Sequence, residues 1–173
     1  MKTLIYILVV LGLSASVLSQ DWSINRSSPL YKQCGQSWSL NRLGSSSTIC
    51  KVGCLMTSVS SAMAGLGLTI NGQTANPETL NAWLLKNGGY VSNLFSLGAV
   101  GKLGLKYQNK SSSSADIKKA IRDNKVVVLN VNGGGHWVLA TGIQGNTYTV
   151  NDSGSSKTSF PFSGVTQAAI FTF

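Results

Sequence analysis

The spacing of apolar residues predicts helices over the first two thirds of the chain. These helices are expected over residues 54–66, 76–86, 94–103 and 115–124. The second has the best-marked start, because Asn76 is a good capping residue, Pro77 suits the first helical position and Glu78 places an acid in the first turn. The third helix has the weakest pattern.

After residue 125 the pattern changes to the short apolar runs of β-strands. Strands are expected over residues 126–131, 137–143, 147–151 and 169–173. Gly145 and Asn146 form the pair of residues typical of a two-residue hairpin turn. The serine-rich stretches 31–53 and 111–114 are expected to be loops. Helices followed by adjacent antiparallel strands favour an α+β fold.

The first nineteen residues have the layout of a secretory signal peptide. Met1 and Lys2 form a short basic start, an apolar run covers residues 4–13, and small residues follow up to a predicted cleavage after Ser19. The apolar run falls short of the roughly 20 residues that span a bilayer, so a membrane anchor is the less favoured alternative. The mature chain is therefore expected to be one domain, residues 20–173, without a transmembrane segment.

The composition narrows the class of protein further. Hydrophobic residues make up 43% of the chain and charged residues 11%, which is enough apolar material for a core and excludes a chiefly disordered chain. Lys and Arg number 14 against 5 Asp and Glu, and the formal net charge is +9. His136 is the one histidine, so mechanisms that need two histidines are excluded.

The chemistry-bearing residues near the carboxyl end are His136 and Asp152. His136 opens a predicted strand after three glycines, and Asp152 ends the next strand. A hairpin turn at Gly145-Asn146 brings both to the same end of the hairpin. The residue numbers of two positions that pair about this turn add up to 291, and those of His136 and Asp152 add up to 288, which is close to that value. A carboxylate beside an imidazole fixes its tautomer and favours its protonated form. A buried structural histidine is the alternative.

The third candidate is Cys54, which opens the first predicted helix. A helix amino terminus favours a thiolate through its free N–H groups and its dipole. Cysteine on a helix, followed by histidine on a strand and then an acid, is the papain-type order for nucleophilic acyl transfer. The alternative is a core cysteine or half of a disulfide.

The cysteine count bears on this choice, because three cysteines in a secreted chain leave one unpaired. A disulfide between Cys34 and Cys50 would close a loop of about 17 residues, worth roughly 3 kcal/mol, and would leave Cys54 free. A bond between Cys50 and Cys54 would spoil the helix start. A zinc site from the three cysteines and His136 is a further alternative, disfavoured by the secretory context and the lack of a Cys-x-x-Cys pair.

Two blocks of the sequence resemble a known family. Residues 31–38 (YKQCGQSW) with 48–58 (TICKVGCLMTS), and residues 136–142 (HWVLATG) with 148–152 (YTVND), are similar to the bacteriocin-processing-type cysteine peptidases, in particular to their stand-alone secreted branch. The resemblance covers about residues 31–152. It implies a papain-like fold, with a nucleophile helix and further helices packed on a carboxyl-terminal antiparallel sheet, and no cofactor or metal.

The resemblance also implies roles for individual residues. Cys54 would be the nucleophile, His136 the general base and acid, and Asp152 the orienting acid. Gln33 would supply the side chain of the oxyanion hole together with the backbone amide at Cys54, and Gln36 is the alternative glutamine.

The sequence therefore predicts a secreted cysteine hydrolase, most readily a peptidase acting on a peptide or protein. The alternatives are an amidase or endopeptidase of cell-wall peptides and a non-enzymatic secreted binding protein with the same fold. The expected location is the extracellular space or the lumen of the secretory pathway or vacuole. Nucleic acid is not an expected partner. A basic face formed by Lys118, Lys119, Arg122 and Lys125 is either merely solvated or attracted to anionic cell surfaces.

Overall fold

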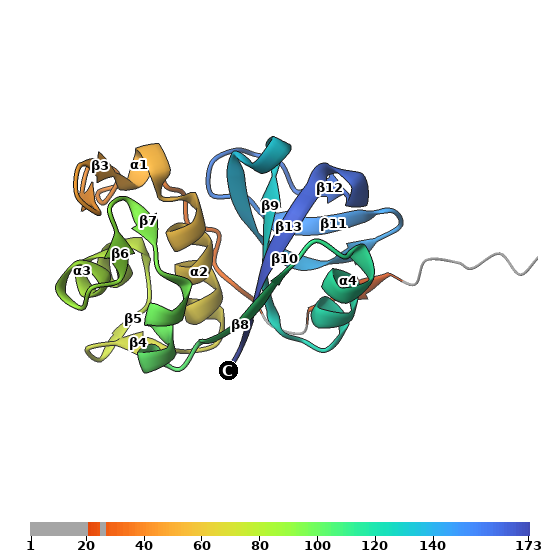
Figure 1. Ribbon diagram of the computed structural model, residues 1–173, viewed down its shortest axis with the longest axis horizontal. Coiled ribbons are helices and arrows are strands. Elements are labelled where there is room, and N and C mark those ends of the chain that lie inside the picture. The colour runs from red at the N-terminus through yellow and green to blue at the C-terminus, as the bar shows by residue number, and fades with distance from the viewer. Residues whose placement is uncertain (1–20, 25–26) are drawn as a thin grey trace, which may run out of the picture.

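A central helix, α2 (Cys54–Gly65), lies between a helical part and a curved antiparallel sheet (Figure 1). The computed structural model describes residues 21–24 and 27–173. The predicted signal peptide, residues 1–19, lies outside the described residues, and its cleavage stays a prediction.

The helical part is built from short elements around α2. It contains α1 (Ile49–Val52), α3 (Pro77–Lys86), the 3-10 helix η1 (Leu97–Leu103) and the hairpins β2–β3 (Arg42–Leu43, Ser47–Thr48), β4–β5 (Thr69–Ile70, Gln73–Thr74) and β6–β7 (Tyr90–Val91, Leu94–Phe95). The start of α3 follows the sequence reasoning, because the Asn76 side chain accepts from the Thr79 N–H and the Thr79 hydroxyl accepts from the Asn76 N–H.

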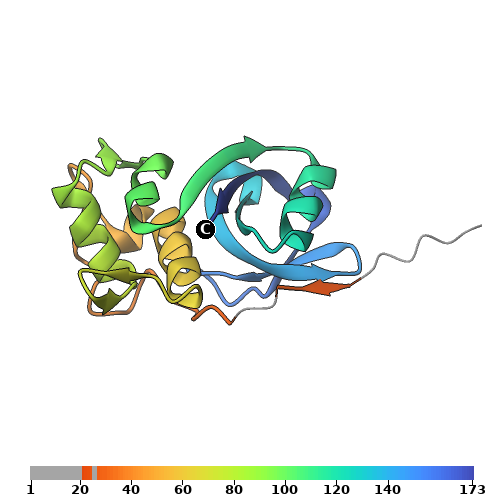
Figure 2. The same ribbon diagram turned by 90° about the horizontal axis from the view of Figure 1, so that it is seen from below.

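The sheet curls around helix α4 (Ser114–Arg122), as the view from below shows (Figure 2). Its strands follow in the order β12 (Ser159–Pro161), β11 (Thr147–Asn151), β10 (His136–Gln144), β9 (Val126–Val131), β13 (Val165–Thr172) and β8 (Lys106–Ser111), with β1 (Trp22–Ser23) paired to β10. Short 3-10 turns, η2 (Asn132–Gly134) and η3 (Phe162–Gly164), follow β9 and β12. All of these pairings are antiparallel. The expected α+β fold is confirmed.

The two faces of the sheet bury two separate cores. Ile117, Ile121 and the inward residues of β9, β10 and β13 form the core around α4. Leu139 and Val128 face the other way and pack with Met56, Val59 and Met63 of α2. Strand β10 therefore connects the sheet core to α2, because its alternate residues contribute to both cores.

The hairpin β10–β11 has the predicted turn. Gln144 pairs with Thr147, so Gly145 and Asn146 form the two-residue loop. The register shifts by one between Ala140 and Gly142, where Thr141 forms a bulge. Beyond this bulge, paired positions sum to 290 instead of 291, which leaves the end of β11 beside the start of β10.

Several local predictions were wrong. The stretch 31–53 is not simply a loop, since it contains β2, β3 and α1. The helix expected over 94–103 is a strand followed by a 3-10 helix, because Ser92 adopts a left-handed φ of 55° and turns the chain into the β6–β7 hairpin. In the serine run 111–114, Ser112 and Ser113 form the predicted loop, but Ser111 ends β8 and Ser114 begins α4. The last strand begins at Val165, four residues earlier than expected.

Two further features concern surfaces and membranes. Within residues 21–24 and 27–173, no helix combines the length and apolar character needed to cross a bilayer. The basic face of α4 is partly engaged within the chain, because Lys119 pairs with Asp123 at 2.7 Å and Lys118 lies 4.5 Å from the centre of the Phe162 ring. Attraction of this face to anionic surfaces stays a prediction.

Candidate active site

The amino terminus of α2 presents a free thiol. Cys54 is the first residue of the helix, is partly exposed and forms no disulfide. A sharp turn at Gly53 separates α1 from α2, and the Gly53 N–H donates to the Ile49 carbonyl at 2.8 Å. A side chain at Gly53 would collide with that same carbonyl oxygen, so the turn that aims Cys54 requires glycine. The backbone N–H groups of the first turn have no acceptor within the helix.

His136 lies opposite this helix start, at the beginning of β10. The glycine turn before it is held by Asn130, which is buried in β9 and whose side-chain amide donates to the carbonyls of Gly134 at 3.0 Å and His136 at 3.2 Å. Thr166 in turn donates to the Asn130 side-chain oxygen at 2.6 Å. The backbone of His136 is thereby fixed on the sheet while its ring remains 16% exposed.

The His136 ring joins a thiol and a carboxylate. Its Nε2 lies 2.7 Å from Oδ1 of Asp152, which leaves Nδ1 for Cys54. The hydrogen bond with Cys54 is the largest influence on the ring, and together with the hydrogen bond and charge of Asp152 it outweighs burial, which lowers the pKa. The pKa of His136 is raised to about 9, so the imidazolium form persists well above neutral pH.

Asp152 is 1% exposed, and each of its oxygens is satisfied. Oδ1 accepts from His136, from the Gly154 N–H at 2.8 Å and from the Ser155 N–H at 3.0 Å, while Oδ2 accepts from the Ser155 hydroxyl at 2.6 Å. Burial, the largest single influence, raises the pKa of Asp152, but the hydrogen bonds from Ser155, His136 and Gly154 together bring it below its usual value. The carboxylate is therefore ionised and rigidly held.

The structure distinguishes between the two candidate glutamines. Gln33 is buried at 8% exposure, and its Nε2 donates to the Cys50 carbonyl at 2.8 Å, four residues before Cys54. Gln36 is exposed, and its backbone N–H donates to the Ser39 hydroxyl. Of the two glutamines, only Gln33 lies beside both Cys50, at the start of the segment that leads to Cys54, and His136.

Two hollows flank the Cys54–His136 pair. One, of about 280 Å³, includes Cys54 in its wall and is otherwise mainly apolar. Its apolar lining includes Leu43, Val52, Leu55, Tyr90, Phe95 and Trp137. The other, of about 320 Å³, is polar and includes Gln33, His136, Ser155 and Lys157. A chain passing from one hollow to the other would cross the thiol and the imidazole.

Trp137 directly follows His136 on β10, so alternation along a regular strand turns its side chain to the opposite face. It packs partly buried against the core around α2 and also lines the apolar hollow beside Cys54. The Nζ of Lys110 lies 5.8 Å from the centre of its ring. Trp137 therefore contributes both to the core around α2 and to the wall of the apolar hollow.

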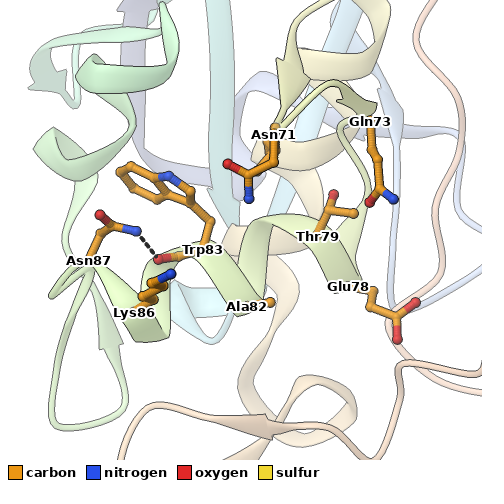
Figure 3. A pocket seen from close by; sticks show the side chains of 9 residues that line it. Asn71, Gln73, Glu78, Thr79, Ala82, Trp83, Lys86 and Asn87 are labelled. Carbon is orange, nitrogen blue, oxygen red and sulfur yellow. Dashed lines mark hydrogen bonds between the residues drawn. The ribbon is translucent and has the colours of Figure 1, made fainter.

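A separate cavity lies away from these residues, between α3 and the β4–β5 hairpin. Figure 3 shows Trp83 of α3 and Asn71 of the hairpin turn on its two sides. It measures about 500 Å³, and its lining contains neither a cysteine nor a histidine. This cavity therefore lacks the thiol and the imidazole that meet at the start of α2.

Sequence reasoning named Cys54, His136, Asp152 and Gln33, and the structure brings all four together. It also contains the Cys34–Cys50 disulfide and leaves Cys54 as a free thiol. The residues that sequence reasoning missed are those that hold the acid, chiefly Ser155 and Gly154. A signal for them was present, because Asp followed by Ser-Gly-Ser is typical of a turn in which the acid accepts N–H groups two and three residues on.

Gly154 gives a first prediction. A Cβ there would lie 2.8 Å from Cε1 and 3.2 Å from Nε2 of His136. We expect Gly154→Ala to displace the ring and lower the turnover number by about tenfold to a hundredfold, because small misplacements of a catalytic group are costly. The thermal unfolding temperature should change little, since a side-chain ring moves aside more easily than backbone does.

The control for this variant is Gly98→Ala, which adds a methyl group where no atom lies within 4 Å. Peptide hydrolysis and thermal unfolding are measured for both variants. Full activity in Gly154→Ala would show that the ring does not need its present position.

Known proteins are similar to this chain in family and in fold. The Peptidase C39-like family matches residues 27–165. Among solved structures, the chain is similar to a double-glycine-motif protease from an AMS/PCAT transporter in complex with the leader peptide, with 15% identity, a TM-score of 0.53 and coverage of 88% of this chain and 97% of that one. It is also similar to a putative C39-like peptidase from Bacillus anthracis, with 14% identity, a TM-score of 0.56 and coverage of 89% and 98%. At these identities the structures share a fold. No curated protein sequence matches the chain.

Proposed function

Since the chain belongs to the Peptidase C39-like family and is a papain-like cysteine peptidase, we propose that it is an exported peptidase whose catalytic triad is Cys54, His136 and Asp152. One observation supports this most directly. The His136 ring is hydrogen-bonded on one side to the free thiol at the start of α2 and on the other to a buried, ionised carboxylate.

The proposed reaction follows from this geometry. Cys54, as thiolate, attacks the carbonyl carbon of the scissile bond, and its sulfur forms a new bond as the carbonyl electrons move to oxygen. His136 gives its Nδ1 proton to the departing amine, which leaves a thioester on Cys54. The neutral ring then takes a proton from water, the hydroxide attacks the thioester, and the acid product leaves as Cys54 regains its thiolate.

The developing oxyanion requires donors. The backbone N–H of Cys54 lies in the first turn of α2, where it has no helical acceptor. Gln33 uses one N–H of its amide on the Cys50 carbonyl, and its second N–H remains for the substrate. We assign these two groups to the oxyanion hole.

A peptide substrate fits the two hollows and agrees with one of the similar structures, a protease in complex with a leader peptide. The apolar hollow beside Cys54 suits an apolar substrate side chain, and its walls come from both the helical part and β10. Export is supported by the signal-peptide layout of residues 1–19 and by the Cys34–Cys50 disulfide, since such bonds persist in oxidising compartments.

The direct test is labelling with an irreversible thiol-directed inhibitor built on a peptide, followed by mapping of the modified cysteine. We expect a single label on Cys54 and parallel loss of cleavage of a mixed peptide library, with Cys54→Ala unlabelled and inactive. Cleavage of peptidoglycan stem peptides but not of the library would assign the chain to cell-wall peptides. Absence of label together with cleavage of neither substrate would refute the assignment of Cys54 as the nucleophile.

Gln33 gives a second prediction. We expect Gln33→Ala to lower the turnover number about a hundredfold, the usual cost of losing one oxyanion donor, with a small change in KM. Gln36→Ala is the matched control, because Gln36 is exposed, and it should keep full activity. Steady-state kinetics on a cleaved peptide compare the two. If Gln36→Ala loses activity instead, the wrong glutamine has been assigned.

A further inference from the structure

Residues 32–34 connect the helical part of the molecule to the sheet. Lys32 donates from Nζ to the carbonyls of Asp152, at 2.8 Å, and of Ser155. The Gln33 N–H donates to the Ser153 carbonyl at 3.0 Å. Residue 34 is then joined by the disulfide to Cys50 at the start of the nucleophile region. Three consecutive residues therefore connect the loop that carries the acid to the segment that carries the thiol.

Gln33 is the centre of this connection, and both ends of its amide are used. Its Oε1 accepts from the Ser153 hydroxyl at 3.1 Å, on the side of the sheet. Its Nε2 donates to the Cys50 carbonyl at 2.8 Å, on the side of the helix. Since the side chain is 8% exposed, loss of either partner would leave a buried polar atom without a hydrogen bond.

The disulfide closes a small ring around this side chain. Cys34 follows Gln33 directly, and Cys50 is both its covalent partner and the residue whose carbonyl holds the Gln33 amide. The covalent bond therefore limits how far the amide and its acceptor can separate. Without it, the Gln33 side chain would keep one direct hydrogen bond to Cys50, and the loop that follows it would be held through the Cys50 N–H, which donates to the Ser39 carbonyl at 2.9 Å.

We propose that the Cys34–Cys50 disulfide and the Ser153 hydroxyl are positioning elements that hold the Gln33 amide at the oxyanion hole. The proposal rests on the proposed function, because it concerns the same reaction. It extends that function by making turnover depend on the redox state of a pair of cysteines that take no part in the bond-making steps. An external dithiol would reduce the disulfide to two thiols and itself become a cyclic disulfide, and turnover would fall while the triad stays assembled.

A double-mutant cycle tests whether the disulfide acts through Gln33. Cys34→Ser with Cys50→Ser is made in the natural chain and in Gln33→Ala. In the natural chain we expect the turnover number to fall about tenfold with little change in KM, a part of the roughly hundredfold cost of losing the oxyanion donor. In Gln33→Ala the same pair should cost less than about twofold, since linked residues are not additive. An equal loss in both backgrounds would overturn the proposal.

The rate of Cys54 alkylation at pH 6 separates positioning of Gln33 from damage to the triad. It should be unchanged by removal of the disulfide, because His136 and Asp152 keep their partners. Slower alkylation would contradict the proposal. Ser153→Ala is the second variant, and it should lower the turnover number in the same way while leaving the disulfide intact. Removal of the disulfide should lower the thermal unfolding temperature in both backgrounds. This fall reports the contribution of the disulfide to stability, separately from its effect on turnover.

If the variant with both serines does not fold, the disulfide of the natural chain is reduced with dithiothreitol instead. Reversible loss of turnover on reduction, with a folded protein and three titratable thiols, supports the proposal, and full activity with three thiols contradicts it. If the natural chain cleaves no peptide, the proposed function is refuted, but the positioning of the Gln33 amide by the disulfide is not. In that case the NMR signals of the Gln33 side-chain amide report the positioning, and they should shift and exchange faster with solvent when the disulfide is reduced. Unchanged signals would refute it.

Discussion

Replacement of His136 by alanine is expected to abolish peptide hydrolysis, with a loss in turnover on the order of 10⁴-fold or more. His136 is the one histidine in the chain and the group that connects the thiol to the buried carboxylate. Without it, no side chain beside Cys54 can accept and return a proton near neutral pH. The measurement is steady-state cleavage of a peptide that the natural chain hydrolyses.

The same variant should also alkylate more slowly at Cys54 at pH 6. In the natural chain the pKa of His136 is raised to about 9, mainly by the hydrogen bond with Cys54, so at pH 6 the ring is protonated. A protonated imidazole beside a cysteine promotes the reaction of its sulfur with alkylating reagents. Lys119→Ala, a surface change on α4, is the control and should alkylate normally. Unchanged alkylation in His136→Ala would mean that no ion pair exists, and a non-enzymatic binding protein would become the better interpretation.

The sequence carried the local signals for this pair because they depend on short distances along the chain. A two-residue turn at Gly145-Asn146 fixes the register of the hairpin, and the register places the start of one strand beside the end of the next. The bulge at Thr141 shifts that register by one residue, which no local pattern indicated. The prediction of proximity holds because this shift lowers the sum of paired positions from 291 to 290, nearer to the 288 of His136 and Asp152, whose side chains meet at 2.7 Å.

The connection between Gln33 and the acid loop could not be obtained in this way. Gln33 and Ser153 are 120 residues apart, and their hydrogen bonds depend on how the helical part packs against the sheet. Nothing in the local pattern separates Gln33 from Gln36, and the family resemblance alone ranked them. In the structure the burial of Gln33 and the exposure of Gln36 provide a physical distinction.

The short strands of the helical part escaped detection for a different reason. Strands β2 and β3 are two residues each, too short for alternation to show. Strand β8 reads KYQNKS, which is polar because it lies at the edge of the sheet, where lysines protect an exposed strand. The polar composition of β8 therefore gave no indication that it pairs with β13.

Replacing Asp152 is expected to have effects that depend strongly on the substitute. Asp152→Ala removes the acceptor of four hydrogen bonds at a site that is 1% exposed, and leaves the donors of Gly154 and Ser155 unpaired. We expect turnover to fall on the order of a thousandfold, between the effects of His136→Ala and Asp152→Asn. The variant should also unfold at lower temperature.

Asp152→Asn should be much milder, and the division of hydrogen bonds between the two oxygens explains why. All three N–H donors point to Oδ1, which an asparagine keeps. Oδ2 accepts only from the Ser155 hydroxyl, and a hydroxyl can reverse and accept from an amide. Near pH 6 the turnover should therefore stay within about tenfold of the natural chain, as papain-like enzymes work with a neutral orienting residue.

The charge lost in Asp152→Asn should appear in the pH profile instead. The active form carries the imidazolium, so activity falls as pH rises through the pKa of His136, near 9 in the natural chain. The Asp152 carboxylate is one of the groups that raise this pKa, so its replacement by a neutral amide lowers it and moves the alkaline limb of kcat/KM to lower pH. Asn151→Ala is the neighbouring control: its side chain donates to the Ser28 carbonyl, away from the ring, and the limb should not move. An unshifted limb in Asp152→Asn, with turnover unchanged across the range, would show that the carboxylate does not act on the ring electrostatically and that Asp152 serves only as a hydrogen-bond acceptor.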